Sequence, residues 1–177
     1  MTKTKLSKGF SLIELLVTVS MLGIILGMAI PSFRSMISDN QMSTQSNDFL
    51  SDINFARSEA VKRGESVSLC KSSDSTTCST SASIGWEAGW VIKNSSGNIL
   101  KIHPALKGDA VTLKGETAVK NKIDISPRGF MAASSGKVIL CDSTHQNAQS
   151  KAIVLSTTGR VKVMSGADAS ITNCSPS

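Results

Sequence analysis

The hydrophobic positions at the start of the chain form one long block. Three lysines precede Gly9, and residues 10–30 carry a single charge, Glu14, in an otherwise largely apolar run. A helix of that length, at about 1.5 Å per residue, crosses a bilayer core of roughly 30 Å. The block therefore predicts a transmembrane helix over residues 10–31, with the lysines on the cytoplasmic side.

After Pro31 the pattern becomes amphipathic. Apolar side chains recur at three- and four-residue spacing, which places them on one face of a helix. They are Phe33, Met36, Ile37, Phe49, Ile53, Ala56 and Ala60. Two basic residues followed by Gly64 are typical of a helix end. We expect one helix from about residue 11 to residue 63, kinked at Pro31, whose amphipathic segment 32–64 packs against another part of the chain.

From residue 66 onward the periodicity is that of β-strands. Candidate strands, each bounded by Gly, Ser, Asn or Pro, are 66–71, 89–94, 99–103, 110–113, 122–126, 137–142, 152–155 and 160–164. Residues 95–98 and 157–159 are typical of hairpin loops. The expected fold class is α+β: a long N-terminal helix covers the apolar face of a small antiparallel, sandwich-like β domain over residues 65–177.

Composition agrees with one anchor and one globular domain. The chain has 177 residues, of which 40% are hydrophobic, and four cysteines. An even cysteine count suits an oxidising compartment and allows three pairings. We favour Cys70–Cys78, which closes a short polar loop, and Cys141–Cys174, which ties down a C-terminal tail with few apolar anchors. Zinc ligation is the alternative, but no Cys-x-x-Cys pair or nearby histidine supports a metal site.

The segment Gly9-Phe10-Ser11-Leu12-Ile13-Glu14 resembles the class III signal of type IV pilins and of the pseudopilins of type II secretion. The resemblance implies that a prepilin peptidase cuts after Gly9, removes the leader 1–9, and methylates the new N-terminus at Phe10. Cleavage at that bond leaves the apolar helix attached to the product. The family also shares the helix-disturbing Pro31 some twenty residues on.

Glu14 has a physical meaning of its own. A carboxylate near the centre of a spanning helix makes the free energy of membrane insertion less favourable by on the order of 2.5–3.5 kcal/mol. A carboxylate buried in the membrane therefore suggests a cationic partner. The free amine of a processed Phe10 is such a cation, either one turn away in the same chain or in a neighbouring subunit. The family's assembly scheme uses the neighbour. The alternative is that Glu14 lies near the headgroups, where its cost is small.

Four further blocks narrow the resemblance. Residues 55–64, 67–70, 85–92 and 153–161 look like the FimT/FimU minor pilins and the minor pseudopilin GspH. This implies the pilin fold and a non-enzymatic assembly protein that primes or caps a type IV pilus through Glu14 and Pro31. Its implied partners are major and minor pilins, the prepilin peptidase and an inner-membrane assembly platform. The implied location is a single-pass inner-membrane protein with a periplasmic domain, then the filament or its tip. The alternative is a GspH-like pseudopilin of a type II secretion system.

The excess of basic residues suggests a third function, DNA binding. The chain carries +6, or about +3 once the three leader lysines are removed, and eleven of its basic residues lie from Lys93 onward. Such a field attracts phosphates, including those of DNA. Gly159-Arg160-Val161-Lys162 resembles a Gly-Arg-x-Arg motif associated with DNA binding in some FimT proteins, with Lys162 in place of the second arginine. Arg160 and Lys162 are therefore candidate DNA ligands for uptake in natural transformation. The alternative is a solvated hairpin edge protected by cations.

Other chemistry-bearing side chains do not form a site. Trp86 and Trp90, four residues apart, are on the same face of a strand if they share one, and we expect core anchors rather than a ligand platform. His103 and His145 lie in no metal spacing and beside no recognisable nucleophile. We expect no catalytic residues, no metal and no cofactor.

Overall fold

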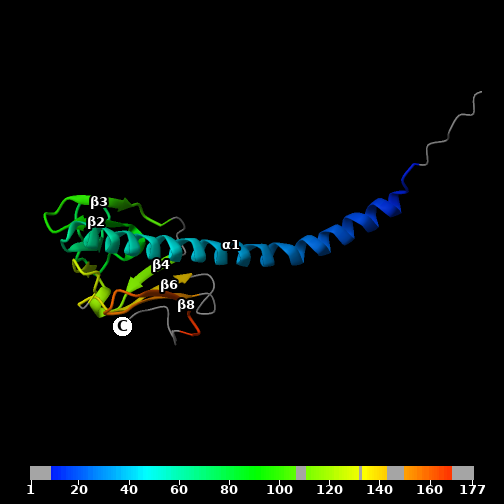
Figure 1. The fold of residues 1–177 in the computed structure, drawn as a ribbon. Helices are drawn as coiled ribbons and strands as arrows, with labels where there is room; N and C mark the ends of the chain where they lie inside the picture. The colour runs from blue at the N-terminus through cyan, green and yellow to red at the C-terminus, as the bar shows by residue number, and fades with distance from the viewer. Residues whose placement is uncertain (1–8, 107–110, 132, 143–149, 169–177) are drawn as a thin grey trace, which may run out of the picture. The chain divides into compact units, whose positions relative to one another are not determined.

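The computed structural model describes residues 9–106, 111–131, 133–142 and 150–168, without the side chains of residues 28–32, 34 and 35. The elements are α1 (Leu12–Arg63), β1 (Val67–Lys71), η1 (Trp86–Ala88), β2 (Trp90–Asn94), β3 (Ile99–His103), β4 (Val111–Gly115), η2 (Thr117–Val119), β5 (Lys122–Ile125), β6 (Gly136–Asp142), β7 (Lys151–Leu155) and β8 (Val161–Ser165) (Figure 1). The chain divides into two compact units, Met1–Ile37 and Ser38–Ser177, and each is described by itself.

The long helix is confirmed nearly to the residue. The amide of Leu15 donates to the Ser11 carbonyl at 3.2 Å, and α1 then continues through Pro31 to Arg63. Gly64 follows with φ +65°, a left-handed conformation that glycine adopts without a Cβ penalty, so the helix ends where the sequence predicts. The kink expected at Pro31 stays a prediction.

In the first unit, the described large apolar side chains of α1 are exposed. Their exposed fractions run from 44% for Val17 to 80% for Leu12. Over the residues that the structure describes, no helix combines the length and the hydropathy that a membrane span requires.

The second unit contains two antiparallel sheets, each with four strands among the described residues. Their orders are β3-β2-β1-β5 and β4-β6-β7-β8. All eight predicted strands are found, with ends that differ by one or two residues. The two predicted hairpin loops join β2 to β3 and β7 to β8, and each turns through a glycine, Gly97 or Gly159, with φ +83°. This is the pilin-like α+β arrangement that the sequence predicts.

The core of the second unit lies where α1 meets both sheets (Figure 1). Phe49, Ile53, Ala56 and Ala60 are fully buried, which confirms that this part of the helical stripe covers the sheets. Apolar residues of both sheets belong to the same cluster. The helix therefore belongs to the core as an integral layer, because each sheet has one apolar face to bury.

The apolar positions at the start of the predicted stripe, before Ser38, are not buried. Phe33, Met36 and Ile37 are 67%, 61% and 46% exposed, so the expectation that they pack on the chain is wrong. Burial on the helix begins at Met42, which is fully buried. The physical reason is that the folded unit starts at Ser38, and the helix before it meets no sheet of its own unit.

Candidate functional site

The predicted processing site lies at the start of α1. Gly9 and Phe10 precede the first helical turn, and the Phe10 side chain is 77% exposed. A Cβ placed on Gly9 meets no atom within 4 Å. Glu14 is exposed on the first turn, and among the described residues it has neither a hydrogen bond nor an ion pair. The predicted counter-charge, the free amine of Phe10, does not exist before cleavage, because Gly9 and Phe10 are joined by a peptide bond.

Two hydroxyl side chains of this segment bond back to carbonyls of their own helix. The hydroxyl of Thr18 donates to the Leu15 carbonyl, and that of Ser20 donates to the Leu16 carbonyl, both at 2.8 Å. Such bonds satisfy the hydroxyl donors within the helix, which is the requirement in an apolar environment. The surface of this segment is thus apolar on every side, with Glu14 as its one charge.

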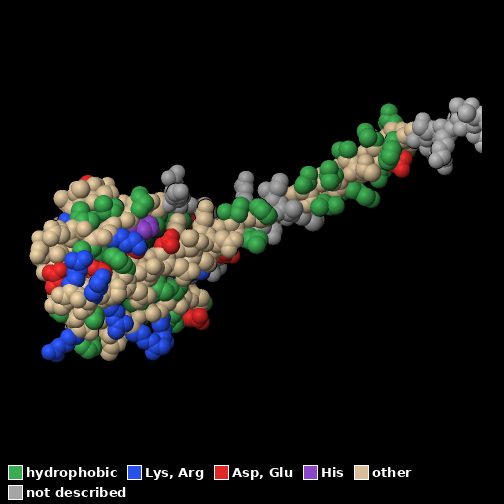
Figure 2. Space-filling view, turned by 45° about the horizontal axis from the view of Figure 1, so that its top comes forward, with side chains coloured by type: hydrophobic (Ala, Val, Ile, Leu, Met, Phe, Trp, Pro, Cys, Tyr) green, Lys and Arg blue, Asp and Glu red, His purple; other side chains and the backbone are tan. Residues whose placement is uncertain are grey.

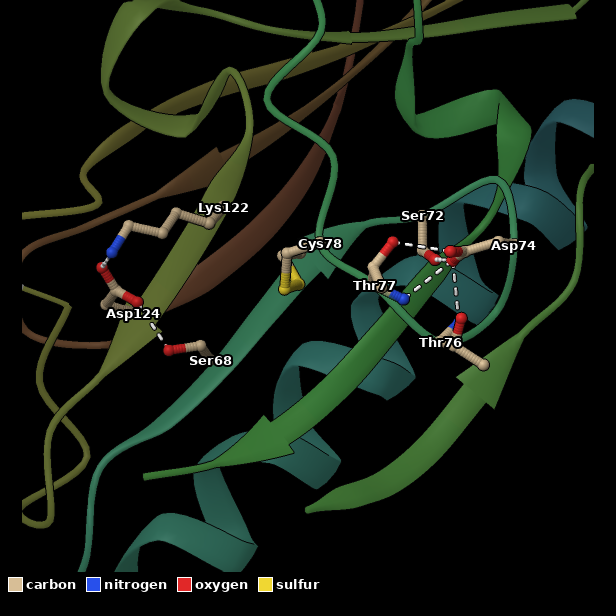
Figure 3. Close-up of a disulfide and its surroundings, with 9 residues drawn as sticks. Ser68, Ser72, Asp74, Thr76, Thr77, Cys78, Lys122 and Asp124 are labelled. Carbon is tan, nitrogen blue, oxygen red and sulfur yellow. Dashed lines mark hydrogen bonds and ion pairs between the residues drawn. A yellow bond between two sulfur atoms is a disulfide. The ribbon is translucent and has the colours of Figure 1, made fainter. Parts of the chain in front are cut away.

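The second candidate feature is the disulfide loop after β1. Cys70 and Cys78 are bonded, with their Cα atoms 5.5 Å apart, so this predicted pairing is confirmed (Figure 3). Inside the loop, one Asp74 carboxylate oxygen accepts from the amides of Thr76 and Thr77, at 2.9 and 2.8 Å. The Thr77 hydroxyl, which donates to the other oxygen at 2.6 Å, then these two amides and the Ser72 hydroxyl, hold the pKa of Asp74 well below its usual range.

The second predicted disulfide reaches beyond the described chain. Cys141 lies buried in β6, and its predicted partner Cys174 is outside the described residues. The pairing Cys141–Cys174 therefore stays a prediction. His145 is also outside the described residues.

The two tryptophans are core anchors, as expected. Both are fully buried, and Phe49 meets each ring edge-on at centroid distances of 5.3 Å for Trp86 and 4.9 Å for Trp90. They do not share a strand, because Trp86 lies in the short helix η1 and only Trp90 lies in β2. His103 stacks on Trp90 at 3.9 Å, so this histidine packs against the core.

A buried carboxylate that the sequence analysis missed joins the helix to the sheet. Asp52 is 2% exposed, accepts from the Trp90 indole at 2.8 Å, and pairs with the Lys101 ammonium at 2.6 Å. The three residues come from α1, β2 and β3. The signal available in the sequence is weak: an aspartate at the edge of the apolar stripe, between Phe49 and Ile53.

The predicted basic motif lies at the turn between β7 and β8. Arg160 and Lys162 are exposed, and within the described chain neither side chain has a hydrogen bond or ion pair. Figure 2 shows Lys and Arg side chains gathered in several groups on one face of this unit. The free guanidinium and ammonium groups are available to a polyanion.

A second turn lies against this one, which the sequence did not indicate. The Met131 amide donates to the Thr157 carbonyl at 3.0 Å, and a Cβ on Gly159 would stand 2.1 Å from the Gly129 carbonyl oxygen. Arg57 of α1 lies against both glycines, with its Nε 2.9 Å from a Cβ built on Gly129 and 3.2 Å from one built on Gly159.

We call the two turns, 126–130 and 156–160, with Arg57 beneath them, the turn pair. Arg128 and Phe130 project from the first turn into solvent, and the Phe130 ring is 47% exposed. The structure therefore brings Arg57, Arg128 and Phe130 to the same surface as Arg160. Among the described residues no three metal-ligating side chains cluster.

The comparison with known proteins decides the family. Residues 45–159 match the family described as Type II transport protein GspH, which covers more than half of the chain. The chain belongs to the GspH family. Residues 4–30 match a second family, the prokaryotic N-terminal methylation motif. Together the two matches identify a minor pilin or pseudopilin of the type IV pilus and type II secretion group.

Two solved structures share the fold of this GspH-family protein. Both are crystal forms of the type IV minor pilin FimU of Pseudomonas aeruginosa PAO1, each 19% identical to this chain. The first has a TM-score of 0.58 and covers 72% of this chain and 91% of FimU. The second has a TM-score of 0.54 and covers 71% and 94%. No curated protein sequence matches the chain.

Proposed function

We propose that this GspH-family protein is a minor pilin that primes or caps assembly of a type IV pilus. The observation that carries the proposal is the contrast within α1: an exposed apolar segment, whose Glu14 has no partner among the described residues, precedes a segment whose apolar stripe from Met42 to Ala60 is buried by its own β unit. A helix that is apolar all round needs an apolar environment, which a bilayer or the packed helices of a filament provide.

The proposal assigns a role to each predicted residue at this end. Peptidase cleavage follows Gly9, Phe10 becomes the methylated N-terminus, and residues 10–31 hold the protein in the inner membrane before assembly, with the β unit in the periplasm. In the filament, Glu14 pairs with the Phe10 amine of a neighbouring subunit, and Pro31 relaxes the helix at the end of the apolar run. The partners are other major and minor pilins and the inner-membrane assembly platform.

The test separates insertion from assembly. Glu14→Ala removes a charge from the apolar run, so membrane insertion should be intact or improved while incorporation into filaments falls. Asp39→Ala is the matched control, because Asp39 is an exposed carboxylate of the same helix within the folded unit. Membrane fractionation and the count of pili are measured in parallel. Normal piliation by the Glu14 variant would refute the proposed pairing.

A minor pseudopilin of a type II secretion system is the alternative, supported by the match of residues 45–159 to the Type II transport protein GspH family. Both systems use the same kind of N-terminal helix, so a deletion strain discriminates between them. Loss of surface pili with normal protein secretion supports the pilus role. Loss of secreted proteins with normal pili supports the pseudopilin role.

A second candidate function is sequence-independent DNA binding at the turn pair, favoured by the exposed Arg160 of one turn, the exposed Arg128 of the adjacent turn, and Arg57, which lies against the glycines of both. The full chain in detergent should then retard DNA on a gel, with an affinity that falls steeply as salt rises, because counterions are released. Arg160→Ala with Lys162→Ala should reduce the salt slope by about one unit for each phosphate that the variant no longer neutralises. Lys122→Ala is the control, because Asp124 already occupies that ammonium at 2.7 Å. If the wild-type chain shows no gel shift at low salt, the basic residues only keep the hairpin edge soluble.

A further inference from the structure

A pocket of about 330 Å³ opens beside the disulfide loop, and none of the features above uses it. Its walls are the segment 82–87, which includes η1, and the segment from the end of β4 to η2. Lys71, at the end of β1, also lines it. Lys114 and Lys120 contribute two further ammonium groups, whereas Glu87 is the one carboxylate among the lining residues.

Lys71 is an unusual residue to find in such a place, because it is 2% exposed. Its ammonium donates to the carbonyls of Ser81 and Ile84, at 2.7 and 2.6 Å. An ammonium has three N–H donors, so one remains beyond these two bonds. Burial lowers the pKa of Lys71, and the charge of Lys120 lowers it further. The positive charges at the pocket therefore repel one another.

The one carboxylate of the pocket is already engaged. An oxygen of Glu87 accepts from the Leu113 amide at 3.0 Å, and its carboxylate folds over Gly85, where a Cβ would stand 2.1 Å from it. Lys114 and Lys120 are exposed, and in the described chain their side chains have no hydrogen bond or ion pair. Three cations thus face one anion, which leaves a surplus of positive charge at the mouth of the pocket.

We propose that this pocket binds a small oxyanion, a phosphate or carboxylate group carried on a compact molecule. Lys114 and Lys120 hold the anionic oxygens from the rim, and the remaining donor of Lys71 reaches them from the floor. Ile84 is half-buried, lines the same pocket and provides an apolar wall for the body of the ligand, in front of the fully buried Trp86. The volume is that of a small-ligand site. This site shares no residue with the exposed apolar segment of α1, so its failure would leave the assembly proposal standing.

The experiment measures thermal unfolding of the full chain in detergent as inorganic phosphate or acetate is added at constant ionic strength. A ligand that binds only the folded state raises the unfolding midpoint with concentration. Lys120→Gln and Lys114→Gln each should weaken the apparent affinity by about tenfold, because each removes a hydrogen bond from a charged donor. The matched control is Lys122→Gln, which removes an exposed lysine two residues beyond Lys120 that does not line the pocket.

Each outcome decides the matter. A rise that the two pocket variants diminish and Lys122→Gln retains supports the proposal, and the stronger of the phosphate and acetate responses identifies the headgroup. An equal rise in all four proteins means an adventitious ion only and overturns it. No rise for either anion also overturns it, and direct titration calorimetry of the wild-type chain with both anions checks that result. Basal unfolding of each variant without anion shows whether the substitution itself disturbs the fold.

Discussion

The first half of α1 is much richer in apolar residues than the second half, yet only the second half buries them in its own chain. Residues 12–26 expose apolar side chains on all sides, whereas in the later half Phe49, Ile53, Ala56 and Ala60 are fully buried. The later half shows an apolar stripe with polar residues opposite it, which is the pattern of a helix that covers a core. The earlier half lacks such a polar face. One continuous helix therefore serves two purposes, and hydropathy patterning rather than helix propensity separates them.

The contrast has an energetic consequence. In the second half, each buried apolar side chain stabilises the fold by removing apolar surface from water, at about 25 cal/mol per Å². In the first half, the same surface stays exposed in the single chain and is available for association. Substitutions in the two halves should accordingly change different measured quantities.

The largest effect on folding is expected from Phe49→Ala. The ring is fully buried between Trp86 and Trp90, so its removal should lower the free energy of unfolding by about 3–5 kcal/mol. Phe33→Ala is the matched control, because that ring is 67% exposed on the same helix and should leave the unfolding free energy nearly unchanged. Denaturant unfolding followed by tryptophan fluorescence makes both measurements. Equal losses from the two variants would contradict the division of α1.

The next largest effect is expected from loss of the disulfide. Cys70→Ser with Cys78→Ser removes a cross-link between residues eight apart, which should lower the unfolding free energy by about 2–3 kcal/mol. The change lies wholly in the second unit, so membrane insertion of the apolar segment should be unaffected. Chemical denaturation and membrane fractionation of the same variant sharpen the comparison. If the variant inserted poorly into the membrane but kept its unfolding free energy, the disulfide would act on the apolar segment and not on the fold of the second unit.

A smaller loss is expected from Asp52→Ala. The substitution leaves the buried Trp90 indole N–H without its acceptor, which should cost about 2 kcal/mol. The other partner, Lys101, is 42% exposed and can be hydrated instead. Asp48→Ala is the control, because Asp48 is an exposed carboxylate one helical turn earlier. Thermal unfolding of the two variants compares them, and equal stability would show that the buried contact adds nothing.

The sequence predicted the elements of this fold well but not their assembly. Helix α1 ends at Arg63 because Gly64 can adopt a left-handed φ, and local composition reveals that position. Local patterns also indicate each strand. They do not indicate that β1 pairs with β5, with β2, β3 and β4 between them in the chain, because that pairing depends on contacts far apart in the sequence.

The features of the candidate site also divide into those formed by neighbouring residues, which the sequence predicted, and those formed by distant residues, which it did not. The apolar segment and the Cys70–Cys78 loop are local in sequence and were predicted. The turn pair was not, because Arg57 and the turn around Gly129 meet Gly159 only in the folded unit. The burial of Lys71 was also invisible, since an isolated lysine at a strand end is ordinarily a solvent-exposed residue. Spatial clusters of distant residues are what the structure adds.

The smallest effect is expected from lowering the pH, which should reduce hydrogen-exchange protection in the Asp74 loop but not in the apolar half of α1. The folded chain holds the pKa of Asp74 below its usual range because its carboxylate accepts from Ser72, Thr76 and Thr77. The ordinary aspartate value is about 3.9, so the stabilisation is fully present above that pH and is lost as the pH falls below it. Hydrogen exchange of the Thr76 and Thr77 amides, corrected for intrinsic rates, should therefore accelerate in acid, while the amides of the apolar half of α1 keep their protection. In Asp74→Asn, exchange in the loop should be faster at neutral pH and should lose this acid dependence. An unchanged pH profile in the variant would assign the loop's acid response to another group.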